Sequence, residues 1–259
     1  MFRICRPELQ DIETLAAFNK IPTATRDNTP RKNFDGVVVR KPWGFEYLAC
    51  ESDLVALWAL KLQFNQQTSM HCHPEKLTVM VALTDGIVLS TLTNAHKLNT
   101  GDVVYIEPGV FHRSSSTNLD GDWLLEFETP VDKFDLVRLD DAYGRSVSAY
   151  EGSEHHSTPE DVELIQWLSR YDYVTPKESA VIGKTIISFY RFTPEAVPTT
   201  NSLTTWASQM NLIVLVAETS EKNSDGKELP PLEFISPHDI NRKVSPGDLR
   251  YEFALGVKW

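Results

Sequence analysis

The pattern of apolar positions changes near residue 36 of this 259-residue chain. Before that point, residues 7–20 carry apolar side chains at helical spacing after Pro7, which predicts an amphipathic helix. After it, short runs of valine, leucine and aromatic residues alternate with turn sequences such as Thr84-Asp85-Gly86. Short strands in this arrangement predict an antiparallel β-sandwich or barrel. The predicted strands span residues 37–39, 45–49, 55–64, 77–83, 87–92, 102–106 and 123–128.

The same pattern divides the chain into four segments. Residues 1–35 supply a helix and loop that pack on the barrel, and residues 36–130 form the barrel itself. Residues 131–158 are rich in aspartate and arginine and are predicted to form a polar excursion that leaves the barrel. Residues 159–259 are predicted to hold a helix over 159–170 and a smaller β-rich segment, either a structural or dimerising element or a degenerate second barrel. The predicted fold class is all-β dominated with flanking helices.

Two short segments concentrate the candidate chemistry. In His71-Cys72-His73 the two imidazoles alternate, so on a strand both point to the same side. His112 follows the Pro108-Gly109 turn at the end of an apolar run. If the two segments pair inside a barrel, three imidazoles converge on one divalent ion, and imidazole commonly binds Zn, Fe, Ni and Mn. We therefore predict a metal site made of His71, His73 and His112, with positions open for water or substrate.

The overall charge narrows the classes of partner. A net charge of −11 disfavours nucleic acids and anionic membranes as partners, because both repel an acidic protein. The three cysteines are few and odd in number, which fits a reducing compartment rather than a disulfide framework. No apolar run has the length of a signal peptide core or a membrane helix. The sequence therefore predicts a soluble cytoplasmic protein.

Four segments carry a resemblance to a known family. They are Lys41-Pro42-Trp43-Gly44, Ser69-Met70-His71-Cys72-His73-Pro74-Glu75-Lys76, Pro108-Gly109-Val110-Phe111-His112-Arg113 and Asp135-Leu136-Val137-Arg138-Leu139-Asp140-Asp141-Ala142-Tyr143-Gly144-Arg145. With them, residues 36–130 resemble the cupin (jelly-roll) barrel, and residues 36–146 are similar to the cupin domain of phosphomannose isomerases. This resemblance implies a metal-dependent, isomerase-like or epimerase-like enzyme of carbohydrate metabolism that acts on a sugar or sugar phosphate.

The chain departs from the family at one position of the metal site. Cupin isomerases place a glutamate ligand four or five residues after the second histidine, where this chain has Leu77 and Thr78. Either Glu75 or Gln63 replaces that ligand, or the site contains three histidines alone.

The isomerase reading also assigns roles to charged residues. Glu75 and Glu126 are candidate bases, and Glu126 shares one face of a strand with Glu128, either the barrel interior or the solvated outer face. Lys76 and Arg113 flank the ligands and are candidates for holding a phosphate or sugar hydroxyls.

Two other functions fit the same residues. Three histidines without a carboxylate also suit an iron-dependent dioxygenase. A sugar-binding or regulatory cupin without catalytic activity is the third reading, which the missing glutamate favours. A homodimer is compatible with all three, since open sheet edges often pair across a dimer.

Overall fold

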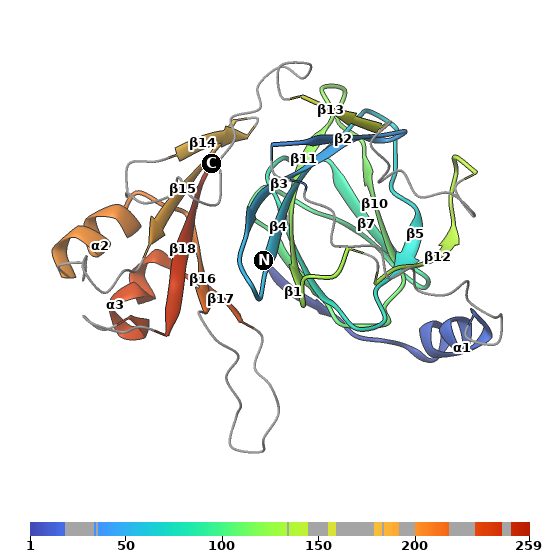
Figure 1. Ribbon diagram of the computed structural model, residues 1–259, viewed down its shortest axis with the longest axis horizontal. Coiled ribbons are helices and arrows are strands. Elements are labelled where there is room, and N and C mark those ends of the chain that lie inside the picture. The colour runs from blue at the N-terminus through green and yellow to red at the C-terminus, as the bar shows by residue number, and fades with distance from the viewer. Residues whose placement is uncertain are drawn as a thin grey trace. The chain divides into compact units, whose positions relative to one another are not determined.

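A computed structural model describes residues 1–18, 34, 36–133, 135–144, 155–158, 179–182, 184–191, 200–217, 231–244 and 250–259 (Figure 1). The chain forms two compact units. The first comprises Met1–Leu48 with Leu57–Val162, and the second comprises Ala49–Ala56 with Glu163–Trp259. The predicted loop over residues 21–33 and the predicted helix over 159–170 lie outside the described residues. No described helix is long and apolar enough to cross a bilayer.

The first unit is a jelly-roll β-barrel made of two sheets, and its strands are mostly antiparallel, as the strand pattern predicts. Figure 1 shows its two sheets facing each other around a common core. The larger sheet has the strand order β1 (Phe2–Cys5), β9 (Val103–Ile106), β6 (Leu77–Ala82), β11 (Asp122–Thr129), β4 (Ala56–Leu62), β3 (Gly44–Glu51), β2 (Val38–Lys41) and β13 (His156–Ser157). The smaller sheet has the order β12 (Val137–Asp140), β5 (Met70–Cys72), β10 (His112–Ser116), β7 (Ile87–Thr91) and β8 (Ala95–Lys97).

The core of this unit is made by the apolar runs that predicted the strands. Leu124, Leu125 and Phe127 of β11 are all fully buried, although they alternate in direction along the strand. Burial of each such side chain stabilises the fold by roughly 1.5–3 kcal/mol. The core therefore extends to both faces of the central strands, which leaves little exposed apolar surface there.

Helix α1 (Leu9–Phe18) packs against the smaller sheet beside the start of β10. The predicted helix over residues 7–20 is observed as α1. The buried Asp11 carboxylate accepts hydrogen bonds from the backbone N–H of Glu8 and of Phe111, each at 2.9 Å. Phe18 packs on Phe111, next to the start of β10. This helix therefore helps to hold the residue before His112 in place.

The polar segment over residues 131–158 differs from its expected form. Rather than leaving the barrel, Val137–Asp140 forms β12, which pairs with β5 so that Arg138 lies opposite His71. Farther along, His156–Ser157 forms β13, which pairs with β2. Both are strands at the edge of a sheet, where one face meets solvent and polar side chains are tolerated. The charged composition of this segment is therefore a poor guide to its structure, because β12 and β13 are strands of the barrel.

The second unit contains the smaller β-rich segment that the sequence predicts. Its described strands form one antiparallel sheet, with α2 (Thr200–Ala207) and α3 (Ile240–Lys243) packed on it. Trp206 of α2 is buried in that interface, where its indole N–H donates to Ser188 Oγ at 2.9 Å. A 3-10 turn, η3 (Pro237–Asp239), precedes α3. The strand order is β14 (Ser179–Ile182), β15 (Thr185–Arg191), β18 (Tyr251–Lys258), β16 (Leu212–Ala217) and β17 (Leu232–Ile235).

Replacing Gly44 with alanine should destabilise the first unit by about 2–3 kcal/mol. Gly44 has a φ of +143°, and an added Cβ would lie 1.9 Å from the backbone carbonyl oxygen of Lys61 in β4. Gly36→Ala is the matched control, because Gly36 also has a positive φ but no atom within 4 Å of an added Cβ. Urea denaturation should show a smaller loss for the control, near 1–2 kcal/mol. Equal losses in the two variants would contradict the steric argument.

Candidate metal centre

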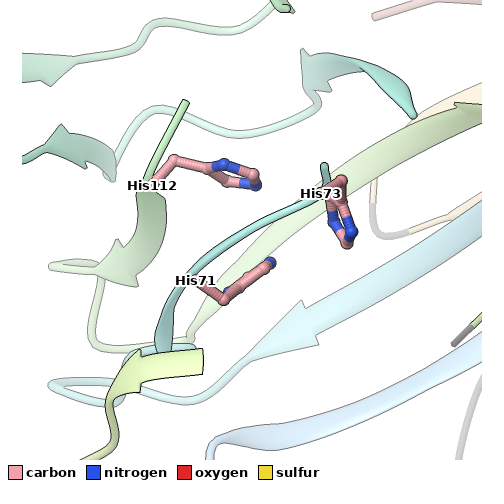
Figure 2. Close-up of side chains that lie close together, drawn as sticks. All are labelled: His71, His73 and His112. Carbon is pink, nitrogen blue, oxygen red and sulfur yellow. The ribbon is translucent and has the colours of Figure 1, made fainter. Parts of the chain in front are cut away.

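Three histidines from two paired strands meet inside the barrel. His71 lies in the middle of β5, His73 follows the end of that strand, and His112 begins β10 directly opposite His71. Their ring centroids are 4.6 Å apart for His71 and His112, 5.1 Å for His71 and His73, and 5.6 Å for His73 and His112. Figure 2 shows the rings turned toward a common space. One nitrogen from each lies within 4.8 Å of the others, so the convergence expected from the sequence is present.

Backbone carbonyls fix which nitrogen of each ring carries the proton. Nδ1 of His71 lies 2.8 Å from the carbonyl oxygen of Ser69, and Nδ1 of His112 lies 2.9 Å from that of Val110. Nδ1 of His73 is bonded to the carbonyl oxygen of Asp135. A carbonyl oxygen only accepts, so each Nδ1 donates an N–H and each Nε2 keeps its lone pair. This arrangement orients imidazoles as metal ligands.

Burial keeps the three rings neutral. His112 is fully buried, and Nε2 of both His73 and His112 has no hydrogen-bond partner. Burial lowers the pKa of His112 to about 4. Burial and the neighbouring imidazoles hold the pKa of His71 well below its usual range, and burial with the Lys76 charge does so for His73. Neutral imidazoles with unpartnered lone pairs are the form that binds a metal ion.

The donor set therefore fits a borderline divalent cation. A buried polar nitrogen without a partner costs free energy, and a metal ion would satisfy both of the buried unpartnered Nε2 atoms at once. Three imidazoles with open positions match catalytic rather than structural sites for ions such as zinc or iron.

Two carboxylates extend the cluster along β11. Glu126 and Glu128 are both buried and line the pocket beside the histidines, which assigns them to the barrel interior rather than the solvated face. A carboxylate oxygen of each lies within 4.8 Å of a His73 nitrogen. Burial and the Glu128 charge raise the pKa of Glu126 to about 8. Burial would also raise the pKa of Glu128, but the Lys76 and Lys133 charges outweigh it and lower that pKa.

A pocket opens over this cluster. Its volume is about 80 Å³, and its mouth is open to solvent. Glu46 forms ion pairs with two lysines of the pocket. Its carboxylate lies 2.8 Å from Lys133 Nζ and 3.4 Å from Lys41 Nζ. The ammonium group of Lys133 also lies 3.6 Å from the centre of the Trp58 ring. The lining residues are Lys41, Trp43, Glu46, Leu60, Thr68, Ser69, His71, His73, Glu126, Glu128, Lys133, Leu136 and Arg138.

Four charged or polar residues predicted for the site lie apart from the three imidazoles or outside the pocket. Gln63 is exposed in the turn after β4, and Glu75 is exposed while its backbone N–H donates to Asp135 Oδ2. Neither lines the pocket, so the structure does not place either side chain beside the three histidines. Arg113 alternates with the inward-facing His112 and pairs with Asp140 at 3.7 Å. Lys76 is buried and pairs with Glu128 at 2.9 Å, rather than facing a phosphate.

Sequence reasoning overlooked several residues of the pocket. Glu46 and Lys133 carry no motif of their own, and only the fold brings them together. Arg138 could have been identified from the sequence, because it belongs to the segment that resembles the isomerases. Its Nε donates to Ser69 Oγ at 3.2 Å, and that hydroxyl lies 3.2 Å from His71 Nδ1. Arg138 therefore contacts Ser69, the residue whose backbone carbonyl accepts from Nδ1 of His71.

The metal-free protein should lose stability as the pH falls from about 6.5 to 4. The unfolded His112 takes up a proton near pH 6.5, whereas the buried ring does so only near pH 4. The unfolded state therefore binds more protons over this range, which lowers the free energy of unfolding by about 3 kcal/mol through this residue. Urea denaturation at several pH values measures the slope. His112→Gln should show a shallower decline, and an unchanged slope would refute this origin.

Solved structures match parts of this chain at low sequence identity. No family model and no curated protein matches this chain. KdgF from Halomonas sp. is 11% identical with a TM-score of 0.34, over 36% of this chain and 84% of its own. A cupin-like protein from Thermotoga maritima is 17% identical with a TM-score of 0.34, over 39% and 80%. The capsular polysaccharide assembling protein CapF from Staphylococcus aureus is 11% identical with a TM-score of 0.36, over 40% and 34%.

Proposed function

We propose that this protein is a metal-dependent enzyme that transfers a proton on a sugar or sugar phosphate, as isomerases and epimerases do. His71, His73 and His112 hold a divalent cation, and Glu126 carries the proton. The observation that supports this most directly is the set of three converging, neutral imidazoles beside a buried carboxyl group. When bound, the ion supplies Lewis-acid polarisation of a carbonyl or hydroxyl oxygen.

Glu126 has the properties of a proton carrier at neutral pH. Its pKa of about 8 leaves it largely protonated near pH 7, yet close enough to that pH to release and regain a proton. Isomerisation moves a proton between adjacent carbons, and epimerisation removes and returns one at a single carbon. One carboxyl group on one face of the substrate can serve isomerisation, whereas epimerisation needs a second acid on the opposite face to return the proton with inversion.

The remaining pocket residues suit a polar substrate with several hydroxyls. Lys41, Lys133 and Arg138 place N–H donors around the opening, while Glu46 can accept from a hydroxyl. Trp43 gives the pocket an apolar wall of the kind that packs against a sugar ring. A phosphate or carboxylate on the substrate would meet the basic groups.

The decisive experiment combines metal analysis with isotope exchange. Protein purified without added metal is analysed for its metal content and then incubated with a panel of sugar phosphates in deuterated water. We expect about one divalent ion per chain and deuterium at a carbon next to a carbonyl of one substrate, detected by NMR. Binding of a sugar phosphate without exchange would instead support a non-catalytic sugar-binding protein.

A second candidate function is favoured by the composition of the ligand triad. Three imidazoles without a carboxylate in the triad leave the full charge of an iron ion uncompensated by its ligands, which suits a three-histidine dioxygenase. Fe(II) content together with substrate-dependent oxygen consumption would support this function. Full deuterium exchange under nitrogen would argue against it.

A further inference from the structure

The interior face of β6 lacks a carboxylate at the point where it approaches the metal centre. Thr78 is fully buried there, and its hydroxyl oxygen has no hydrogen-bond partner. The strand register places Glu128 of β11 directly opposite Thr78. Side chains of residues paired in this way have Cβ atoms roughly 4.5–5.5 Å apart, so Glu128 projects into the space beside Thr78.

A nearby anion would stabilise a divalent ion bound by three neutral imidazoles. The charge of the ion would be buried, and burying uncompensated charge is costly. A Glu128 oxygen lies within 4.8 Å of a His73 nitrogen. The Lys76 ammonium group, fully buried and 2.9 Å from Glu128 Oε1, requires an ionised carboxylate as its partner. Glu128 is therefore an anion already present beside the three histidines.

We propose that Glu128 supplies the anionic charge of the metal centre from β11, in place of a carboxylate on β6, and that Lys76 is its counterion when no metal is bound. This inference rests on the proposed metal centre. The ion and Lys76 then compete for one carboxylate, so the lysine weakens metal binding. Removing Lys76 should strengthen it, and removing Glu128 should weaken it.

Metal affinity measured by calorimetry with Zn²⁺ tests both halves of the proposal. Glu128→Gln should bind at least about 10-fold more weakly than the unmodified protein, and Lys76→Met should bind several-fold more tightly. Glu13→Gln, at an exposed position on α1, is the control for loss of a carboxylate elsewhere. Unchanged affinity in Glu128→Gln would overturn the proposal. Absence of zinc binding by the unmodified protein would instead refute the metal centre itself.

A folding defect would not imitate the expected result. Glu128→Gln leaves Lys76 buried without its partner, so circular dichroism must show a native spectrum before affinities are compared. Lys76→Met/Glu128→Gln removes both buried charges, and comparison with Lys76→Met isolates the carboxylate in a neutral background. The same loss of about 10-fold is expected there. No loss in that comparison would also overturn the proposal.

Moving the carboxylate between strands gives the most specific readout. The double variant Thr78→Glu/Glu128→Gln places it on β6 while removing it from β11. Affinity should recover to within about threefold of the unmodified protein, because the two positions face the same space. A purely structural role of Glu128 predicts no recovery. A natively folded double variant that binds as weakly as Glu128→Gln would overturn the exchange between strands.

Discussion

Replacing His73 with alanine is expected to weaken divalent metal binding at least about 100-fold while leaving the metal-free fold intact. The ring contributes one of three converging nitrogens, and its Nε2 has no other partner. Loss of its Nδ1 bond to the Asp135 carbonyl should cost the metal-free protein only about 1 kcal/mol. Calorimetry with Zn²⁺ measures the affinity, and elemental analysis measures the content of bound metal.

Thermal stability provides an independent measurement of the same variant. A ligand present at a thousand times its dissociation constant stabilises a folded protein by about 4 kcal/mol. Added zinc should therefore raise the unfolding temperature of the unmodified protein and have little effect on His73→Ala. His96→Ala is the control, because His96 lies on β8 and contacts Arg3 rather than the cluster. Equal zinc stabilisation of His73→Ala and the unmodified protein would show that the histidines do not hold the ion.

Replacing Glu126 with glutamine should lower the rate of proton exchange on the substrate about 10²–10⁴-fold without loss of bound metal. Glutamine keeps the size of the side chain but can neither release nor accept the proton. Because the buried carboxyl is largely neutral near pH 7, the substitution removes little charge. The measurement is deuterium incorporation into the sugar phosphate identified by the screen.

Two binding measurements distinguish the loss of a proton carrier from a loss of metal or substrate binding. Calorimetry with Zn²⁺ and with the sugar phosphate should give affinities within about threefold of the unmodified protein. Glu13→Gln, at an exposed position on α1, serves again as the control for loss of a carboxylate. If Glu126→Gln exchanges deuterium at the normal rate, Glu126 is not the proton carrier and the acid or base must be another group lining the pocket.

The histidine triad could be predicted from sequence because local rules govern it. Alternation places His71 of β5 and His73, which follows the end of β5, on one side of the chain, and the turn at Pro108-Gly109 precedes the strand that begins with His112. The structure pairs these strands at His71 and His112. Only the pairing of β5 with β10 could not be predicted from these local rules, because it depends on the whole fold.

The carboxylates could not be assigned to a face from the sequence. Alternation shows that Glu126 and Glu128 share a side of β11, but seven of the eight residues of that strand are buried, so polarity does not reveal which side faces the pocket. A strand covered on both faces loses the alternation that identifies its interior. The charges of Lys76 and Lys133, which come from outside the strand, explain why carboxylates are tolerated there.

The expectation for Gln63 depended on where a strand ended. The apolar run predicts a strand through residue 64, but β4 ends at Leu62 and the chain turns at Asn65, which has a φ of +57°. Strand ends are set by turn geometry more than by hydrophobicity. A difference of two residues moved Gln63 from the barrel wall to an exposed turn.

The pairing of β5 has a consequence for the order of assembly. The carbonyl that fixes the His73 ring belongs to Asp135, 62 residues farther along the chain, and Arg138 reaches Ser69 across 69 residues. Closing loops of this length costs chain entropy before any contact forms, so these pairings should be late events in folding. The lone pair of His73 is then oriented only after the barrel has closed, whereas His71 and His112 are oriented by carbonyls two residues away. The rate at which zinc binds during refolding would therefore report the rate at which the barrel closes.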